Sequence, residues 1–242
     1  MAVNIDTVYQ KVLAIANKEQ RGYITPQEFN LFADKAQNEI YDSYFHDIKM
    51  AEMKPKNSEH YADPMEMAEA KLHPFHVDAN YYTSSSTLII PSMYRLIDVT
   101  RKGNKVTPTN KSQISYTENH PLTKASLTRS VFVREDDLKL TIYPSPSAST
   151  YDYDSDSSGS VDQETFEVSY YKSPSTPNWA YVVVKNKALY NANLSTNFDL
   201  HISEEEILVA KILALSGVTL MKPELVQYGG GMEAAIKASQ KD

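Results

Sequence analysis

His73 and His76 are the nearest thing to a metal-ligand pair in the sequence. They stand three residues apart, but Pro74 lies between them and excludes the helix interior that would bring both rings to one face. No third ligand is fixed close to them, and a zinc site needs at least three protein ligands. We therefore expect these two residues to be turn histidines and not metal ligands.

Three aspartates at alternate positions, Asp152, Asp154 and Asp156, match the first ligands of an EF-hand calcium loop. The match then fails, because Ser157 stands where the motif requires glycine and Gln163 where it requires the bidentate glutamate. A solvated acidic loop is the better interpretation, with adventitious calcium binding left open.

Two clusters of carboxylates, Glu135–Asp137 and Glu204–Glu206, could in principle supply an acid and a base. Glycosidases use such pairs, but sequence gives no distance between the groups. A turn next to a strand explains the first cluster and a helix start the second. Glycine-rich phosphate motifs and the nucleophile elbow are absent, and the chain has Cys 0. We expect no enzyme, no cofactor and no metal site.

The charge balance and hydropathy exclude further classes of function. The 242 residues carry 24 basic and 31 acidic side chains, a net charge of −7, which argues against non-specific binding to phosphate backbones. The longest strongly apolar stretch, 207–215, is far shorter than the ~20 residues of a spanning helix, and no secretory signal is visible. We therefore expect a soluble chain with no membrane partner. Tyr 17 is a high count, typical either of strands or of surfaces that face another protein.

The elements that would position any site begin with two amphipathic helices within the first 45 residues. Apolar residues from Ile5 to Ala16 recur at helical spacing. Thr25-Pro26-Gln27-Glu28 then has the form of a capping box that opens a second helix. A shorter helix is expected after Asp63-Pro64.

Past Pro74 the pattern changes to short β-branched and aromatic runs separated by turn residues. Turns are expected at Gly103-Asn104 and, more weakly, at Asn186-Lys187. The expected strands are 88–90, 94–100, 113–116, 131–133, 138–143, 166–171 and 180–184.

The last 40 residues are helical again. Ser203–Glu206 resembles a second capping box, and 207–221 is apolar on nearly every face. Such a helix must be covered all round, by its own domain or by neighbouring subunits. A final helix opens at Pro223, and Gly229-Gly230-Gly231 is expected to interrupt it as a hinge.

The predicted fold class is α+β, with a mostly antiparallel sheet or sandwich inserted between N-terminal and C-terminal helices. The expected divisions are a helical part at 1–80, a β domain at 81–192 with an acidic loop at 145–162, and C-terminal helices at 193–242 that complete the helical part and end in a flexible tail.

This order of elements resembles the head-to-tail connector proteins of tailed phages, as in crAss-like phages and marine podoviruses. The N-terminal block is the most specific part of the resemblance, and the Tyr-Tyr-Lys-x-Pro strand is moderately so. The similar segments are 8–13 with 17–30, Pro91-x-x-Tyr94-Arg95, Leu140 to Pro146, Val168 to Pro174, and Ser203 to Tyr228.

The resemblance implies a non-enzymatic virion protein that forms a ring, typically dodecameric, below the portal at the head–tail junction. Its partners would be copies of itself, the portal protein and adjacent tail or ring proteins. The ring would line the DNA channel without adhering to DNA, and it would reside in the host cytoplasm during assembly. The acidic loop and the glycine triplet have no counterpart in the resemblance.

Two segments are the expected partner contacts, since extended loops and C-terminal segments dock on the neighbouring ring in such proteins. They contribute Tyr151, Tyr153 and Asp154 from the acidic loop, and Tyr228, Gly229, Gly230, Gly231, Met232 and Ile236 near the C-terminus. Deletion of 232–242 is expected to spare folding and weaken docking.

Two other classes of function stay open. One is a peripheral tail or capsid-associated module that binds carbohydrate or is stabilised by calcium. The other is a hydrolase whose cleft lies in the β domain.

Overall fold

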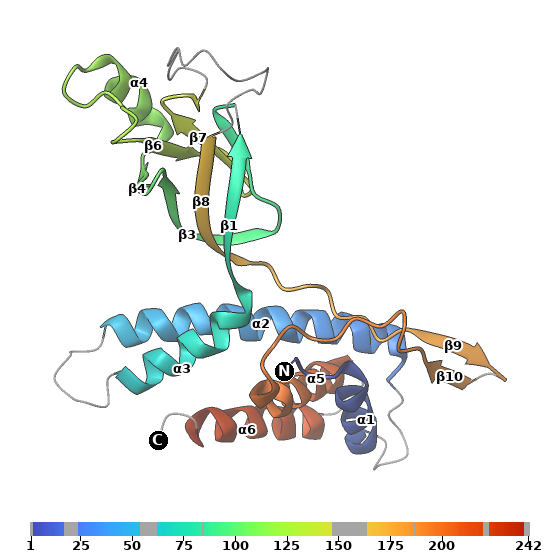
Figure 1. The fold of residues 1–242 in the computed structure, drawn as a ribbon. Helices are drawn as coiled ribbons and strands as arrows, with labels where there is room; N and C mark the ends of the chain where they lie inside the picture. Colours follow the sequence, from blue (N-terminus) through green and yellow to red (C-terminus); the bar gives the residue numbers. More distant parts are fainter. Residues whose placement is uncertain are drawn as a thin grey trace. The chain divides into compact units, whose positions relative to one another are not determined.

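The computed structural model describes residues 2–16, 24–53, 62–83, 85–146, 164–185, 187–219 and 223–239. The chain divides into two compact units, a helical unit of Met1–Pro74 with Pro174–Asp242 and a β unit of Phe75–Ser173. Figure 1 shows helices at both ends of the chain and strands between them. The expected α+β class is confirmed.

The helical unit is built around its most apolar helix, α5. This helix packs against α1, α2 and α6, and α2 also packs against α3. Residues on every side of α5 are buried, including Leu208, Val209 and Leu213, so its own unit covers it. The helices are α1 (Ile5–Ala16), α2 (Pro26–Met53), α3 (Ala62–Leu72), α5 (Glu205–Thr219) and α6 (Pro223–Ser239).

The predicted capping box at the start of α2 is confirmed. The backbone N–H of Thr25 donates to Glu28 Oε2 at 3.0 Å, and the N–H of Glu28 donates back to Thr25 Oγ1 at 3.3 Å. The Thr25 hydroxyl also donates to Glu28 Oε2 at 2.8 Å. The two hydrogen bonds that the Glu28 carboxylate accepts from Thr25 hold its pKa below the ordinary value. Local sequence therefore fixes where α2 begins.

The start of α5 differs from the prediction. Ser203 does not cap it; instead the ring of His201 accepts from the Ser203 N–H at 3.3 Å and opens a short 3-10 turn, η5 (Ile202–Glu204). Glu204 turns inward and pairs with Lys71 of α3 at 2.8 Å. Lys71 is 133 positions away in the sequence. Glu206, the carboxylate that a cap by Ser203 would have used, pairs with Lys11 of α1 at 2.7 Å.

The predicted glycine hinge in the last helix is wrong. α6 runs without a break through Gly229, Gly230 and Gly231. Gly229 is buried where α6 crosses α5, while Gly230 and Gly231 are exposed. Close approach to α5, and not a bend, accounts for the first of these glycines, because a Cβ there would stand 2.6 Å from the Ala210 carbonyl oxygen.

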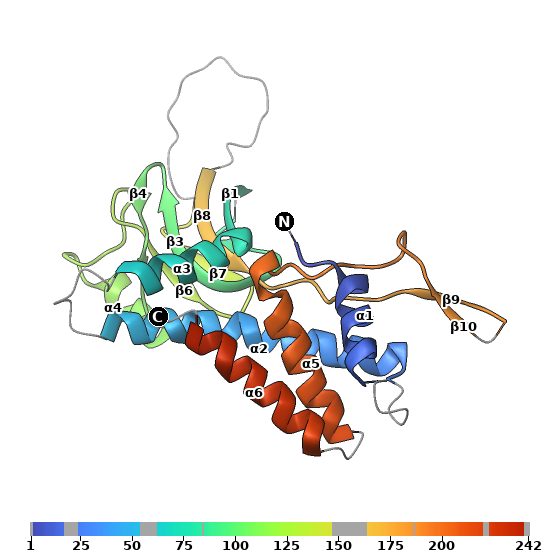
Figure 2. The same cartoon turned by 90° about the horizontal axis from the view of Figure 1, so that it is seen from below.

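Residues 174–200 group with the helical unit, although the sequence placed 174–192 in the β domain. Asn178 and Thr196 form an isolated antiparallel bridge, and beyond it β9 (Tyr181–Val184) pairs with β10 (Lys187–Tyr190). We call residues 178–196 the arm. Figures 1 and 2 both show β9 and β10 extending past the α1 end of the helical unit.

The β unit contains two four-stranded sheets in its described part, and only β5 and β6 pair in parallel there. Side chains of both sheets meet in one apolar core that includes Val99, Leu140 and Phe166. The first sheet has the order β1 (His76–Thr83), β8 (Glu164–Lys172), β3 (Met93–Arg101), β4 (Asn104–Lys105). The second has the order β2 (Thr87–Ile89), β7 (Lys139–Tyr143), β6 (Val131–Arg134), β5 (Thr107–Pro108).

Two local predictions in the β unit need correction, and one strand was missed. The strand expected at 113–116 is helix α4 (Lys111–Asn119), which Asn110 begins and which buries no residue. The predicted hairpin after β3 is present, but Lys102 and Gly103 occupy the turn, with φ of 48° and 77°. Strand β1 was not predicted, because its polar alternation resembles that of a loop.

Candidate functional site

The predicted contact residues divide between described and undescribed parts of the chain. Tyr151, Tyr153 and Asp154 lie outside the described residues, as does the whole Asp152–Asp156 calcium motif. Near the C-terminus, Tyr228 is exposed on α6, whereas Met232 and Ile236 are half-buried. Together with the three glycines they form one continuous helix, so the proposed docking segment is a packed part of the helical unit.

The carboxylate clusters are used in ion pairs and not gathered into a cleft. Glu205 and Glu206 both contact Lys11 of α1, at 2.8 and 2.7 Å. Glu135 pairs with Lys139 at 2.6 Å across the turn between β6 and β7, and this hydrogen bond holds the pKa of Glu135 below its ordinary value.

Histidines contribute no metal site in the described ranges. His76 of β1 lies 3.5 Å from Asp78 and packs edge-on against Tyr171, with ring centroids 5.7 Å apart. No group of three or more histidine, aspartate or glutamate side chains that could hold a metal ion occurs in the described part of the chain.

The buried charges of each unit are paired. In the helical unit, Glu204 is buried beside Lys71, whose amine also lies 5.8 Å above the Tyr44 ring. Burial, and then the charge of Glu204, raises the pKa of Tyr44 well above its ordinary value.

In the β unit, Arg101 is buried and pairs with Glu164. Its guanidinium also donates to Ser130 Oγ at 3.1 Å and to the Pro144 carbonyl at 3.0 Å. These protein partners tie strand β3 to β8 and to the end of β7. Arg101 and Glu164 are therefore explained as structural links between strands.

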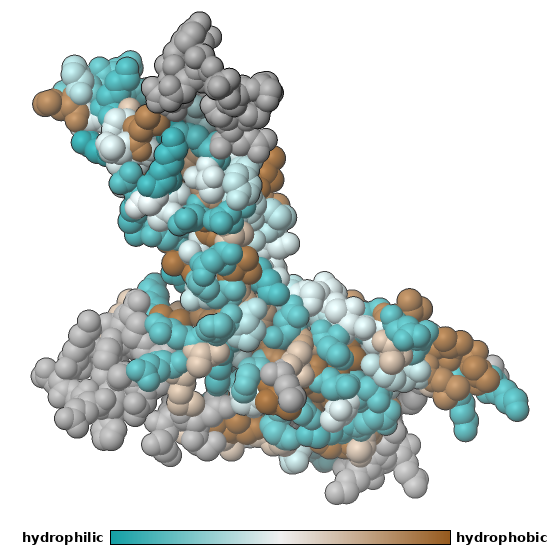
Figure 3. Space-filling model, viewed as in Figure 1, coloured by the Kyte–Doolittle hydropathy of each residue, from teal (hydrophilic) through white to brown (hydrophobic). Residues whose placement is uncertain are grey.

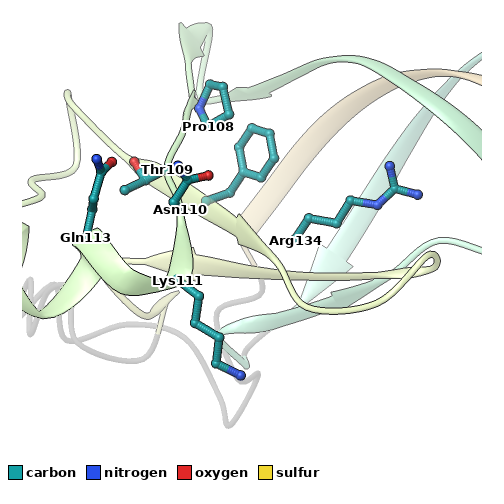
Figure 4. Close-up of a pocket in the computed structure, with 7 residues that line it drawn as sticks. Pro108, Thr109, Asn110, Lys111, Gln113 and Arg134 are labelled. Atoms are coloured by element: carbon teal, nitrogen blue, oxygen red, sulfur yellow. The ribbon is translucent and has the colours of Figure 1, made fainter.

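A pocket of about 380 Å³ lies beside α4 in the β unit. Its lining contains two cationic side chains, Lys111 and Arg134, but no carboxylate, histidine or serine. Figure 4 shows these two side chains diverging from one another. The guanidinium of Arg134 is occupied by the turn carbonyls of Asp136 and Asp137. The lining does not provide a nucleophile next to a base.

Trp179 anchors the arm to the helical unit through a hydrogen bond and aromatic contacts. Trp179 is buried, and its indole N–H donates to Asp6 Oδ1 at 2.9 Å. One face of the Trp179 ring system packs on Tyr9, with centroids 4.3 Å apart, and Tyr181 and Tyr190 of the arm stack on it at 5.9 and 5.7 Å. The chain's single tryptophan thus joins the arm to α1.

Two amides on one face of α2 hold the arm and the irregular segments on either side of it. Asn30 accepts the Trp179 backbone N–H at 2.8 Å and donates to the Asn178 side chain at 2.9 Å. Gln37, seven residues later, donates to the Ser175 carbonyl at 2.7 Å and accepts the Asp199 N–H at 3.1 Å. The arm is therefore fixed at its root by hydrogen bonds to two successive sites on α2.

Beyond this root the arm exposes apolar side chains on both of its faces. The pairing register puts Val182, Val184 and Leu189 on one face and Val183 on the other. These four side chains are between 46% and 62% exposed. Figure 3 shows the hydrophobic residues gathered over β9 and β10, with hydrophilic residues at the tip. The described part of the chain thus leaves the arm's apolar faces largely uncovered.

Sequence reasoning identified 180–184 as a strand but missed its role. The signal was three consecutive valines before a two-residue turn, with no third strand following to cover them. A strand that is apolar at successive positions requires cover on both faces.

None of the described helices combines the length and the hydropathy needed to cross a bilayer. A scan against protein-family models matches no family, and no curated protein matches the chain.

Proposed function

We propose that this chain is a non-enzymatic structural protein of a phage virion, and that it assembles into a ring at the head–tail junction below the portal. The arm is the observation that carries this proposal. It is anchored at its root by Trp179, Asn30 and Gln37, yet the described part of the chain leaves its apolar faces largely uncovered.

A two-stranded ribbon of this kind is marginally stable in water by itself. Contact with another protein would bury its apolar side chains and pair the unsatisfied edges of β9 and β10. Interfaces that hold permanent assemblies together are rich in such buried apolar surface. The arm therefore supports a role in assembly over one in catalysis.

The resemblance in the N-terminal block and in the Tyr-Tyr-Lys-x-Pro strand supports the place of that assembly. An acidic chain with net charge −7 suits a ring through which DNA passes without adhering. The partners in this proposal are further copies of the chain, the portal protein and the adjacent ring or tail proteins, in the virion.

Quantitative mass spectrometry of purified virions tests the proposal. The expected result is a small whole-number ratio between copies of this chain and copies of the portal protein. If infected cells express the chain but the virions purified from them lack it, the proposal is overturned. The hydrolase and binding-module classes would then remain to be tested.

A further inference from the structure

The arm has two strand edges whose backbone groups point away from it. The N–H of Asn191 donates to the Ala180 carbonyl at 2.9 Å, so these two residues form a hydrogen-bonded pair at the root of the hairpin. Hydrogen-bonded and non-hydrogen-bonded pairs alternate along an antiparallel ladder. The register of β9 with β10 therefore directs the N–H and carbonyl groups of every second residue outward. These residues are Tyr181 and Val183 of β9, and Ala188 and Tyr190 of β10.

Both edges are open within the described part of the chain. There β9 and β10 form a two-stranded sheet that no further strand joins, and Figures 1 and 2 show the hairpin projecting past α1. Open strand edges are templates for pairing with another chain, and proteins often protect them with lysine. Lys185 and Lys187 are the charged residues of the arm. Both stand at its tip, which leaves the edges nearer the root without a charged residue.

The two edges of the arm match each other. In the hairpin, Tyr181 lies level with Tyr190, and Val183 lies level with Ala188. Copies related by rotation about one axis carry arms that run in the same sense along it, so β9 of one copy runs antiparallel to β10 of the next. The outward groups of the two strands then lie at the same level. Each such pair of residues can therefore exchange two backbone hydrogen bonds.

The same register aligns the side chains of neighbouring arms. Within one arm, Val182, Val184 and Leu189 share one face and Val183 lies on the other. Edge pairing between copies keeps this division, because residues directly opposite each other in a ladder point to the same face. Val182 of one copy then lies opposite Leu189 of the next. The exposed apolar side chains of each arm thus gain neighbours of their own kind.

We propose that the arms of neighbouring copies pair edge to edge, β9 of one with β10 of the next, and close into a β-barrel around the axis of the ring. This inference rests on the proposed ring and names its subunit contact. The contact joins two different edges, so it is heterologous, and closure leaves no free edge. Barrels of about 16–18 strands already enclose a water-filled channel. The dodecamer that the resemblance implies supplies more strands than that, with two from each copy.

A single junction between two arms is small. The paired strands are four residues long, and they bury much less than the ~800 Å² per partner of a stable interface. Two copies should therefore not form a lasting dimer in dilute solution. Each arm has two edges, however, and a closed ring engages both of them. Closure supplies the stability that one junction lacks.

Disulfide cross-linking tests the junction directly, because the chain has Cys 0. Val182 and Leu189 of adjoining arms form a non-hydrogen-bonded pair, with Cα atoms about 4.5 Å apart, a separation that a disulfide spans. The Val182→Cys and Leu189→Cys variants are mixed at high protein concentration and oxidised. The expected product is a dimer with one chain of each kind. Val183→Cys mixed with Leu189→Cys is the matched control and should give little product, because Val183 points to the opposite face.

Proline substitution tests whether the backbone edge is used. Val183→Pro removes an N–H that points away from the hairpin, so the pairing of β9 with β10 within one copy keeps its hydrogen bonds. In the Val182→Cys copy it should abolish the cross-link, because the β9 edge of that copy forms the junction. In the Leu189→Cys copy it should leave the yield unchanged, because the junction uses the β10 edge of that copy. Circular dichroism and Trp179 emission establish that each variant keeps its fold and the root of its arm.

Three results would overturn the inference. One is cross-linking of Val183→Cys to itself in preference to the expected pair, which would mean that two β9 edges meet about a two-fold axis. The second is a folded mixture of Val182→Cys and Leu189→Cys with no more product than the control. The third is an equal effect of Val183→Pro in the two copies. Failure of the proposed function would look different, because the chain would then be missing from virions even where the cross-link forms.

Discussion

Gly229 of α6 lies so close to Ala210 of α5 that a methyl group at Gly229 would stand 2.6 Å from the Ala210 carbonyl oxygen. The same methyl group would stand 2.8 Å from the backbone nitrogen of Ala214. Since both atoms belong to the backbone, no side-chain rotation relieves the contact. The two helices can pack at this distance only because residue 229 has no Cβ.

Gly229→Ala should therefore destabilise the protein. Overpacking of this kind costs about 1–3 kcal/mol, which exceeds the gain of up to ~1 kcal/mol from replacing a helical glycine by alanine. Gly230→Ala is the matched control, because nothing lies within 4 Å of its added methyl group. That variant should gain about 0.5–1 kcal/mol. Urea denaturation of both variants measures the difference, and equal effects would contradict the packing explanation.

Glu164→Ala should destabilise the β unit strongly. The substitution leaves Arg101 buried without its carboxylate, and breaking a buried ion pair in this way costs about 3–5 kcal/mol. Lys102→Ala, which removes the exposed second partner 3.3 Å from Glu164, should cost less than ~1 kcal/mol. Denaturant midpoints and slopes for the two variants check this contrast.

The Arg101→Met, Glu164→Met double variant tests whether the stability lost in Glu164→Ala comes from an uncompensated buried charge or from altered packing. It should be more stable than Glu164→Ala, because no buried charge is then left uncompensated. A double variant as unstable as Glu164→Ala would show that packing around the pair, and not its charge, accounts for the loss.

Features encoded by neighbouring residues could be predicted from the sequence. The capping box of Thr25 and Glu28 involves residues three apart, and the structure contains it as predicted. The apolar run 207–221 likewise predicts a helix that must be covered on every side, and α5 buries residues on each of its sides. The α+β class follows from such local patterns in sequence order.

Features that depend on distant residues could not be predicted. Three consecutive glycines normally end a helix. Here α6 continues through them, and Gly229 is required because α6 packs closely against Ala210 and Ala214. Ser203–Glu206 has the form of a capping box, but Glu204 pairs with Lys71 and Glu206 with Lys11. The valines of β9 predict a strand within a larger sheet. In the described part of the chain, however, β9 pairs only with β10, and the sequence does not reveal this. In each case the structure depends on which distant residues pack against the segment, and the local sequence does not contain that information.

Tyr190→Ala should loosen the root of the arm and report it optically. Trp179 is the only tryptophan in the chain and is buried against Tyr190. Loss of one stacked ring admits water to the indole, so its fluorescence emission should shift to longer wavelength. Loss of the aromatic pair should also cost about 0.5–1.5 kcal/mol beyond the buried area. Tyr116→Ala, at an exposed position of α4, is the control, and an equal shift there would argue against the anchoring role of Trp179.

Acid should weaken the attachment of α6 through Glu233. Burial opposes ionisation of this carboxyl, but hydrogen bonds from Lys237 and from Lys211 of α5 outweigh it and hold the pKa of Glu233 below its ordinary value of 4.5. Because the folded pKa is the lower one, the ionised group stabilises the folded state above the ordinary value, and this contribution is lost as the pH falls through the folded pKa. Glu233→Gln should lower the melting temperature near neutral pH and reduce the loss on acidification. Glu224→Gln makes the same change at an exposed position of the same helix, and it should retain the acid dependence of the unaltered protein. If both variants follow the same curve from neutral to acidic pH, the ion pairs of Glu233 do not hold α6 to α5.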